Sequence, residues 1–420
     1  MAPPGVGGVV VRYPAWSSVS LSALTYRTVG TDRSVPAYVS SAERYAHIDA
    51  LRAIAVLLVL GVHVIDIGWP REHHPWAKAL LTTVDPGRIG VVLFFAISGF
   101  VIPSSFEGSG WAGARRFLIR RFFRLYPIYW LSVMTTAIVF VGIFKGETIS
   151  WPQLLANATM IHQVLGFESV NPVYWTLSIE LLFYAICLSL FLCGRIQQSR
   201  TLVVIILALG ACLWAWAWLA GFSYHIYTDV PERANALYWL VARLFGVPVQ
   251  AWGNPYFLTL VYLSIMTLGA LLRLWYEDRI VHRIDRIFLW SVVAYWLYLP
   301  VPAVIKAVWL KTGWSQAYLY LTYAIPVALF VLLVCLLQIR SRALCYIGVI
   351  SYSIYVLHTT ILYGVVTVVR AFDVQLGLIL QLSAVLIVLI TLGLAALTYE
   401  TIEKPAMRLG RRLSRQPQGA

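Results

Sequence analysis

Long apolar segments, separated by shorter polar ones, run through most of the chain. Ten of them have the length that a helix needs to cross a bilayer, about 20 residues. They lie at 48–67, 88–106, 126–144, 173–193, 201–221, 255–274, 287–305, 316–338, 345–368 and 376–398. The pattern therefore predicts an all-α integral membrane protein with about ten transmembrane helices in one bundle.

The remaining segments set the boundaries and the orientation. Residues 234–250 are apolar but contain an arginine, a glycine and a proline, so we expect an interfacial or re-entrant helix there. With ten spans, the loops on the side of the termini carry 13 Lys and Arg, against nine in the opposite loops and span edges, which favours cytoplasmic termini. We expect a flexible cytoplasmic N-terminal tail at 1–45, a transmembrane domain at 46–400 and a basic cytoplasmic C-terminal tail at 401–420.

Composition supports the membrane assignment and excludes other classes. Apolar residues make up 60% of the chain and charged ones 12%, with a mean hydropathy of +0.77, which a soluble domain does not tolerate. The net charge is +14, but Lys and Arg are scattered between apolar segments, which argues against a nucleic-acid partner. The five cysteines lack paired-ligand spacing, so we predict no metal site. We expect a multi-pass protein of the inner (plasma) membrane.

The first span carries a stripe of four ionisable residues, Asp49, Arg52, His63 and Asp66. Each costs at least about 2.5 kcal/mol inside a bilayer, so each marks a candidate functional position. Arg52 and His63 lie about 20° apart around the helix axis and about 16 Å apart along it. The stripe therefore leads from the cytoplasmic end toward the outer half of the membrane. Alternatively, Arg52 reaches lipid phosphates and His63 forms a structural hydrogen bond between helices.

A basic and aromatic segment, ARRFLIRRFFRLYPIYW, separates the second span from the third. It is expected as a cytoplasmic loop, and its arginines are Arg115, Arg116, Arg120, Arg121 and Arg124. Guanidinium groups match phosphate oxygens and aromatic rings stack on a purine, a combination that suits coenzyme A. Contact with anionic lipid is the alternative.

Two later spans add candidate catalytic groups. Glu180 lies about 10 Å below the outer end of the fourth span, at a depth similar to that of His63, and we expect it to orient that imidazole. A structural bond to a neighbouring helix is the alternative. In the ninth span, Tyr355 and His358 share a face, which makes His358 a rival for the catalytic role. Gly99, in the second span, either permits close helix approach or leaves room for an acyl chain.

Six of these segments together resemble the acyltransferase-3 family of bacterial membrane acyltransferases. The resemblance covers about residues 46–410, in the order IDALRAIAVLLVLGVH, FFAISGF, RRFFRLYP, WTLSIELLFY, SYSIYVLH and IEKPAMRLGRRL. It implies O-acylation, usually acetylation, of glycans and sometimes of antibiotics, with cytoplasmic acyl-CoA as the donor. It also implies that His63 is essential, that the arginines matching Arg52, Arg121 and Arg124 are required, and that Glu180 occupies a characteristic position.

We therefore predict a membrane-bound O-acyltransferase that moves an acyl group, with acetyl expected, from acyl-CoA to a hydroxyl of a sugar or polysaccharide precursor. His63 acts as a general base or as a transient acyl carrier, with Glu180 as its partner. The acyl-CoA is held by Arg52, Arg121 and Arg124, and the possible supporting residues are Asp49, Asp66, Tyr352, Tyr355 and His358.

The expected partners are acyl-CoA, a carbohydrate or glycolipid acceptor, and the lipid bilayer, with no permanently bound cofactor. A transporter or flippase of a lipid-linked or acylated sugar is the alternative function, because such proteins also carry intramembrane His, Glu and Arg residues. The sequence does not determine the oligomeric state or the identity of the acceptor.

Overall fold

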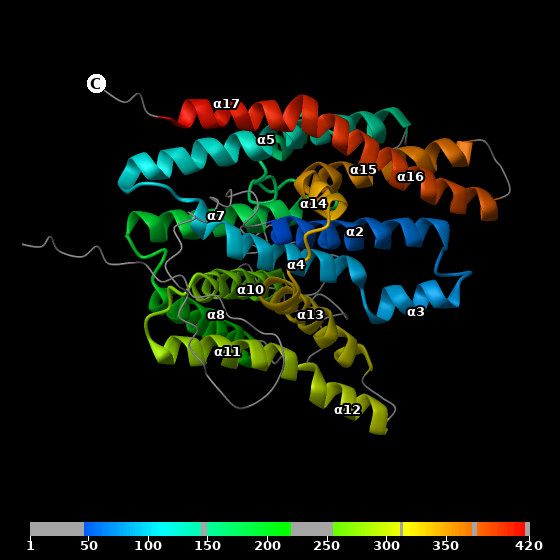
Figure 1. The fold of residues 1–420 in the computed structure, drawn as a ribbon. Helices are drawn as coiled ribbons and strands as arrows, with labels where there is room; N and C mark the ends of the chain where they lie inside the picture. Colours follow the sequence, from blue (N-terminus) through cyan, green and yellow to red (C-terminus); the bar gives the residue numbers. More distant parts are fainter. Residues whose placement is uncertain (1–45, 144–148, 220–254, 311–313, 372–375, 416–420) are drawn as a thin grey trace, which may run out of the picture.

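The computed structural model of the protein describes residues 46–143, 149–219, 255–310, 314–371 and 376–415, and every regular element within these ranges is helical (Figure 1). The longer helices are α2 (Ala46–Gly68), α4 (Pro86–Val101), α5 (Gly110–Ile143), α7 (Trp175–Leu192), α8 (Ser199–Leu219), α10 (Pro255–Tyr276), α11 (Arg283–Tyr298), α13 (Trp314–Leu332), α15 (Ser351–Ala371) and α16 (Leu376–Thr398). The shorter elements are α3 (Pro75–Thr83), η1 (Pro103–Ser105), α6 (Trp151–Ala158), α12 (Pro300–Leu310), η2 (Leu333–Leu337), α14 (Arg342–Val349), η3 (Tyr399–Glu403) and α17 (Lys404–Ser414). The predicted all-α class is confirmed.

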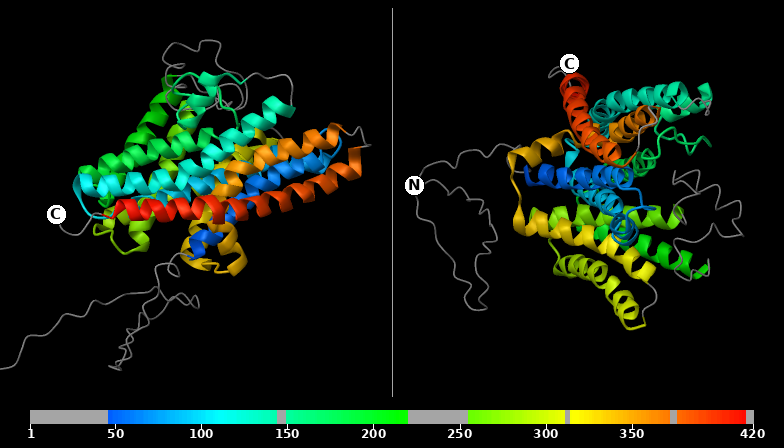
Figure 2. Two further views of the ribbon diagram at one scale, coloured as in Figure 1. Left: turned by 90° about the horizontal axis from the view of Figure 1, so that it is seen from above. Right: turned by 90° about the vertical axis from the view of Figure 1, so that its right-hand side faces the viewer.

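Helices α2 and α4 run through the middle of the bundle. Helix α4 packs against α2, α10 and α13, while α2 also contacts α14, α15 and α16. On one side of this centre lie α5, α15 and α17, and on the other lie α8, α10, α11 and α13 (Figure 1, Figure 2). The stripe of ionisable residues on α2 is therefore surrounded by other helices for most of its length.

Two glycines allow α4 to approach α10 closely. A Cβ atom on Gly99 would collide with the backbone of Met266, and one on Gly269 would collide with the backbone of Ala96. Small residues at such positions let helix backbones touch, which matters in lipid because apolar burial there gives little driving force. Of the two roles expected for Gly99, the structure supports close helix approach, because α10 fills the space beside it.

Eight helical segments are long and apolar enough to cross a membrane, counted over the described residues, where the sequence predicted ten. The predicted span at 287–305 is divided between α11 and α12 where Pro300 interrupts the backbone hydrogen bonds. The predicted span at 201–221 corresponds to α8, whose 21 residues are long enough to cross a bilayer. The predicted interfacial helix at 234–250 and the N-terminal tail lie outside the described residues.

Two basic segments that the sequence placed in a loop and in a tail are helical. Helix α5 begins at Gly110, so the arginines expected in a loop lie on the first half of a 34-residue helix. Helix α17, within the expected tail, packs along α5. Hydropathy marks only the part of a helix that suits the bilayer, so it does not indicate where the helix itself begins or ends.

Candidate functional site

A partly open pocket lies between α2, α4, α5, α7 and α15. Side chains of α4 give it a mainly apolar wall, which includes Phe94 and Val101. Its polar lining includes Arg52, Arg121, Arg124, Glu180, Tyr352 and Tyr355. The sequence singled out all six, and the structure brings them together from four helices.

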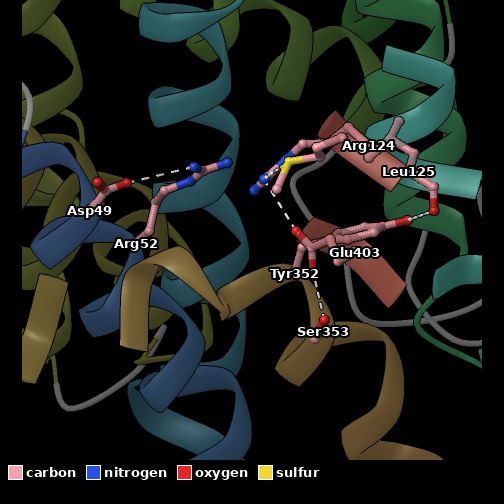
Figure 3. A network of polar contacts seen from close by, with 8 residues as sticks. Asp49, Arg52, Arg124, Leu125, Tyr352, Ser353 and Glu403 are labelled. Atoms are coloured by element: carbon pink, nitrogen blue, oxygen red, sulfur yellow. Dashed lines mark hydrogen bonds and ion pairs between the residues drawn. The ribbon is translucent and has the colours of Figure 1, made fainter. Parts of the chain in front are cut away.

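Arg124 is held by a buried carboxylate that the sequence analysis did not single out. Its Nη1 lies 3.1 Å from Oε1 of Glu403, whose side chain has no exposed surface. Ser353 of α15 donates a hydrogen bond of 2.7 Å to the other carboxylate oxygen, as Figure 3 shows. The positive charge of Arg124 is therefore already balanced within the protein. The one sequence signal for Glu403 was its place in the IEKPAMRLGRRL segment.

Arg121 and Arg52 have weaker internal partners than Arg124. The Arg121 guanidinium lies over the rings of Phe117 and Tyr184, 5.4 Å from each ring centre, and no carboxylate among the described residues pairs with it. Nη1 of Arg52 lies 3.8 Å from Oδ1 of Asp49, and both side chains are partly exposed. Such a long, exposed contact offsets little charge. These two arginines therefore leave the pocket attractive to an anion.

The two tyrosines of α15 brace this helix against its neighbours. Tyr352 donates a hydrogen bond of 3.0 Å to the backbone carbonyl of Leu125 on α5 (Figure 3). The hydroxyl of Tyr355 lies 2.8 Å from that of Thr176 at the start of α7. Both contacts fix the wall of the pocket that leads from the arginines toward the other end of α15.

Glu180 does not form the predicted contact with His63. Its Oε1 accepts hydrogen bonds from Tyr184 at 2.7 Å and from Ser98 at 3.3 Å, and no hydrogen bond among the described residues joins it to His63. Glu180 lines the same pocket as Arg52, which lies about 16 Å along α2 from His63. The sequence analysis estimated the depth of Glu180 from the start of the fourth span, and that estimate did not distinguish the level of Glu180 from the level of His63.

His63 instead lies beside His358, the residue that the sequence analysis treated as its rival. The two ring centres are 5.2 Å apart. Neither histidine is among the residues that line the pocket, but Tyr355 does line it, and its ring centre lies 5.9 Å from that of His358. One turn of α15 therefore separates the pocket from the pair of histidines.

Asp66, at the far end of the stripe, is occupied by another partner. Arg71 binds it with two of its three guanidinium nitrogens, Nε to Oδ1 at 2.6 Å and Nη2 to Oδ2 at 3.2 Å, at a partly exposed position. Asp49 pairs with Arg52 at the opposite end. Of the four residues in the stripe, only Arg52 lines the pocket, and only His63 approaches α15 through an aromatic contact.

The arrangement suits a long ligand with an anionic end and a reactive end. The arginines offer positive charge at one end of an apolar pocket, and two imidazoles lie beyond its other end. Among the described residues, no group of three His, Cys, Asp or Glu side chains is placed to hold a metal ion. The imidazoles and the carboxylate of Glu180 are groups of the kinds that perform acid–base or nucleophilic chemistry.

Comparison with known proteins adds a family to this geometry. The sequence model of the acyltransferase domain family, acyltransferase 3, matches residues 45–400. The chain is 25% identical over 391 residues to "Nodulation protein 10" of Rhizobium leguminosarum bv. viciae, which covers 86% of this chain and 93% of that protein. It is 30% identical over 181 residues to "Putative peptidoglycan O-acetyltransferase YrhL" of Bacillus subtilis, which covers 39% of this chain and 26% of that protein. No solved structure matches it.

Proposed function

This chain belongs to the acyltransferase-3 family, and we propose that it moves an acyl group, with acetyl preferred, from acyl-CoA to a hydroxyl of a sugar or polysaccharide precursor at the membrane. The observation that carries the proposal is the pocket, which gathers Arg52, Arg121 and Arg124 at one end and has two imidazoles beyond the other. Membership of the family supports acyl transfer, whereas the donor, the acceptor and the roles of individual residues are our proposal.

The arginine end of the pocket suits coenzyme A. Arg121 and Arg52 have charge available for its phosphates, and Arg124, balanced by Glu403, holds the shape of the site. Phe117 and Tyr184 hold the Arg121 guanidinium between helices, so little side-chain freedom is lost when a phosphate binds. The pantetheine arm then lies along the apolar wall, with the thioester directed toward Tyr355.

His63 performs the transfer beyond Tyr355. As a general base it takes the proton from the acceptor hydroxyl while the new C–O bond forms and the C–S bond breaks, and the proton goes to the departing thiolate. As an acyl carrier, its nitrogen first displaces the coenzyme A thiolate from the acyl carbon, so that the N–acyl bond forms as the C–S bond breaks. The acceptor oxygen then displaces the imidazole, and the hydroxyl proton leaves to the thiolate. We propose that Glu180 lies near the thioester arm rather than beside the imidazole, and its contacts with Tyr184 and Ser98 support this role.

A glycan acceptor is supported by a relative rather than by a sugar-binding motif in this chain. The Bacillus subtilis relative is named for O-acetylation of peptidoglycan, and it covers only part of this chain. The proposed mechanism itself requires only that a hydroxyl be held beside the base and the thioester, because the acyl group is then transferred to that hydroxyl.

The test uses membrane vesicles that contain the protein, acetyl-labelled coenzyme A and a glycan extract from the host. We expect labelled glycan with the unchanged protein, loss of at least about 100-fold in His63→Ala, and an increase of about tenfold in the KM for acetyl-CoA in Arg121→Ala. His73→Ala changes an exposed histidine outside the pocket and serves as the control. If no CoA-dependent transfer or hydrolysis occurs with any extract, the transferase proposal is overturned and a transport function gains support.

A further inference from the structure

We propose that His358 is the positioning partner of His63, accepting the N–H of His63 through its own Nε2. This inference rests on the proposed function and assigns a role that Glu180 was expected to fill. It says which nitrogen of each ring carries a proton during the transfer. Four features of the structure carry it, namely the hydrogen bond of His358 to the backbone, the state of its second nitrogen, its distance to His63 and the rigidity of α15.

The first ring nitrogen of His358 has a defined role. Its Nδ1 lies 2.7 Å from the backbone carbonyl of Tyr355, one turn earlier on the same helix. A carbonyl oxygen only accepts hydrogen bonds, so Nδ1 must carry the proton that is donated. In the neutral ring, the lone pair is then on Nε2. The backbone of α15 therefore selects the tautomer of this histidine.

The second ring nitrogen of His358 lacks a partner. The side chain has no exposed surface, and Nε2 forms no hydrogen bond to any residue that the structure describes. A buried acceptor without a donor is unfavourable, so it marks a position where a partner is expected. An N–H group that approaches this side of the ring would complete its hydrogen bonding.

His63 is the residue in position to supply that N–H. Its ring centre lies 5.2 Å from that of His358, with the planes inclined at 40°. Because the nitrogens lie on the ring edges, this separation lets one nitrogen of each ring come within about 3 Å, a hydrogen-bond distance. No such bond is formed in the structure, so the proposal requires the half-buried His63 ring to turn one of its nitrogens toward Nε2.

Helix α15 holds His358 firmly enough for a positioning role. Thr359, the next residue, donates a hydrogen bond of 2.9 Å to Asn171, and Thr360 lies 2.6 Å from the hydroxyl of Thr136 on α5. Asn171 is fully buried and also donates to both Thr136 and Thr360. These bonds tie α15 to α5 and to the segment before α7, at the level of His358.

The partnership determines what His63 presents to the substrate. If one nitrogen of His63 donates to His358, the lone pair of the other nitrogen is free for the hydroxyl proton or the acyl carbon. His63 becomes positively charged in either role, and the bond to His358 strengthens as that charge develops. A neutral imidazole serves this purpose without placing a second buried charge in the membrane.

Two substitutions of His358 distinguish this role from a structural one. In His358→Gln, the amide oxygen reaches approximately the position of Nε2 and retains an acceptor for His63. In His358→Asn, the shorter amide retains a donor near the Tyr355 carbonyl but has no acceptor that reaches His63. If His358 is purely structural and acts through its bond to the Tyr355 carbonyl, the Asn variant should be the more active of the two. If His358 positions His63, the Gln variant should be the more active.

We would measure kcat and KM for acetyl-CoA in vesicles, with thermal stability of the purified proteins as a check on folding. We expect kcat to fall by about 100-fold in His358→Asn and by less than about tenfold in His358→Gln, with KM changed little in both. His162→Asn and His162→Gln, at another fully buried histidine with no partner among the described residues, serve as controls and should not show this order.

The outcomes separate the two proposals. An active unchanged protein in which His358→Gln is no better than His358→Asn, at equal folding, overturns the positioning role and leaves the proposed function standing. An unchanged protein that neither transfers nor hydrolyses the thioester overturns the proposed function, and the role of His358 with it.

Discussion

At the scale of single residues, Glu403 has a charge that would be expensive to bury without its partners. Its carboxylate has no exposed surface and is held by Arg124 and Ser353, which belong to α5 and α15. Removing one member of a buried ion pair leaves the other uncompensated, which costs far more than the net contribution of the intact pair. Glu403 therefore joins three helices at the arginine end of the pocket.

We predict that Glu403→Gln lowers the free energy of unfolding by about 3 kcal/mol, because Arg124 then lacks its counter-charge. Thermal unfolding of the purified protein in detergent measures the change. Glu400→Gln, three residues earlier, is the matched control, because its pair with Lys404 is exposed and should contribute less than about 1 kcal/mol. Equal effects of the two substitutions would contradict the role assigned to Glu403.

Buried His162 makes the stability of the folded protein depend on pH. It lies between α6 and α7, is fully buried, and burial lowers its pKa from 6.5 to about 4. Between these two pH values the unfolded chain binds a proton that the folded protein does not bind. The stability that His162 contributes is therefore complete above pH 6.5 and is lost progressively as the pH falls toward 4, by up to about 3 kcal/mol.

The measurement compares thermal unfolding of the unchanged protein and His162→Gln at several pH values between 7.5 and 5. We expect the variant to lose less stability on acidification, because it has no imidazole to protonate in the unfolded state. Other titrating groups affect both proteins equally, so the difference between the two profiles isolates His162. Parallel profiles would show that this histidine is not kept neutral by the fold.

The sequence allowed the residues of the pocket to be predicted, but not their pairing. Arg52, Glu180 and the α5 arginines stood out because charged groups are expensive near a membrane interior. Helical periodicity indicates which face of a helix a residue occupies, but not which helix lies opposite that face. For that reason His63 was assigned Glu180 as its partner, while His358 is the residue found beside it.

At the scale of helices, the close contact between α4 and α10 depends on the glycines at positions 99 and 269, which have no side chains. We predict that Gly99→Ala lowers the free energy of unfolding by about 1–3 kcal/mol, since its methyl group meets the backbone of Met266 and forces the helices apart. The matched control is Gly61→Ala on α2, where a Cβ meets no neighbouring atom within 4 Å.

The control should be neutral or slightly stabilising, because alanine is the better helix former. Thermal unfolding in detergent measures both variants. A loss of stability in Gly61→Ala as large as that in Gly99→Ala would mean that helix packing is not the cause.

Helix boundaries were harder to predict than helix faces. The arginine-rich first half of α5 contains few of the apolar runs that identify a span, yet it is helical, and α17 packs along α5. Pairing of this kind between segments far apart in the chain is a tertiary effect, and local propensity does not report it. The division between α11 and α12 has a local cause instead, because Pro300 interrupts the backbone hydrogen bonds there.

At the scale of the whole molecule, the orientation across the membrane remains a prediction from charge. It places Cys193, an exposed residue just after α7, on the cytoplasmic side, and His73, in the segment between α2 and α3, on the outer side. We therefore expect a membrane-impermeant maleimide to label a variant that retains only Cys193 after the membrane is opened, but not in intact cells.

A cysteine-free variant carrying His73→Cys should behave in the opposite way and be labelled in intact cells. A shift in gel mobility with a large maleimide reagent gives the result directly. Labelling of Cys193 in intact cells, together with protection of the cysteine at position 73, would invert the orientation and place the arginine end of the pocket outside.

The region between the pocket and the two histidines also bears on whether protons can leak across the membrane. Tyr355 lines the pocket and its ring centre lies 5.9 Å from that of His358, which does not line it. An unbroken file of water past the stripe on α2 would conduct protons and drain the electrochemical gradient across the membrane. If the Tyr355 ring closes this path to water, the proposed transfer can take place beside it without loss of the gradient.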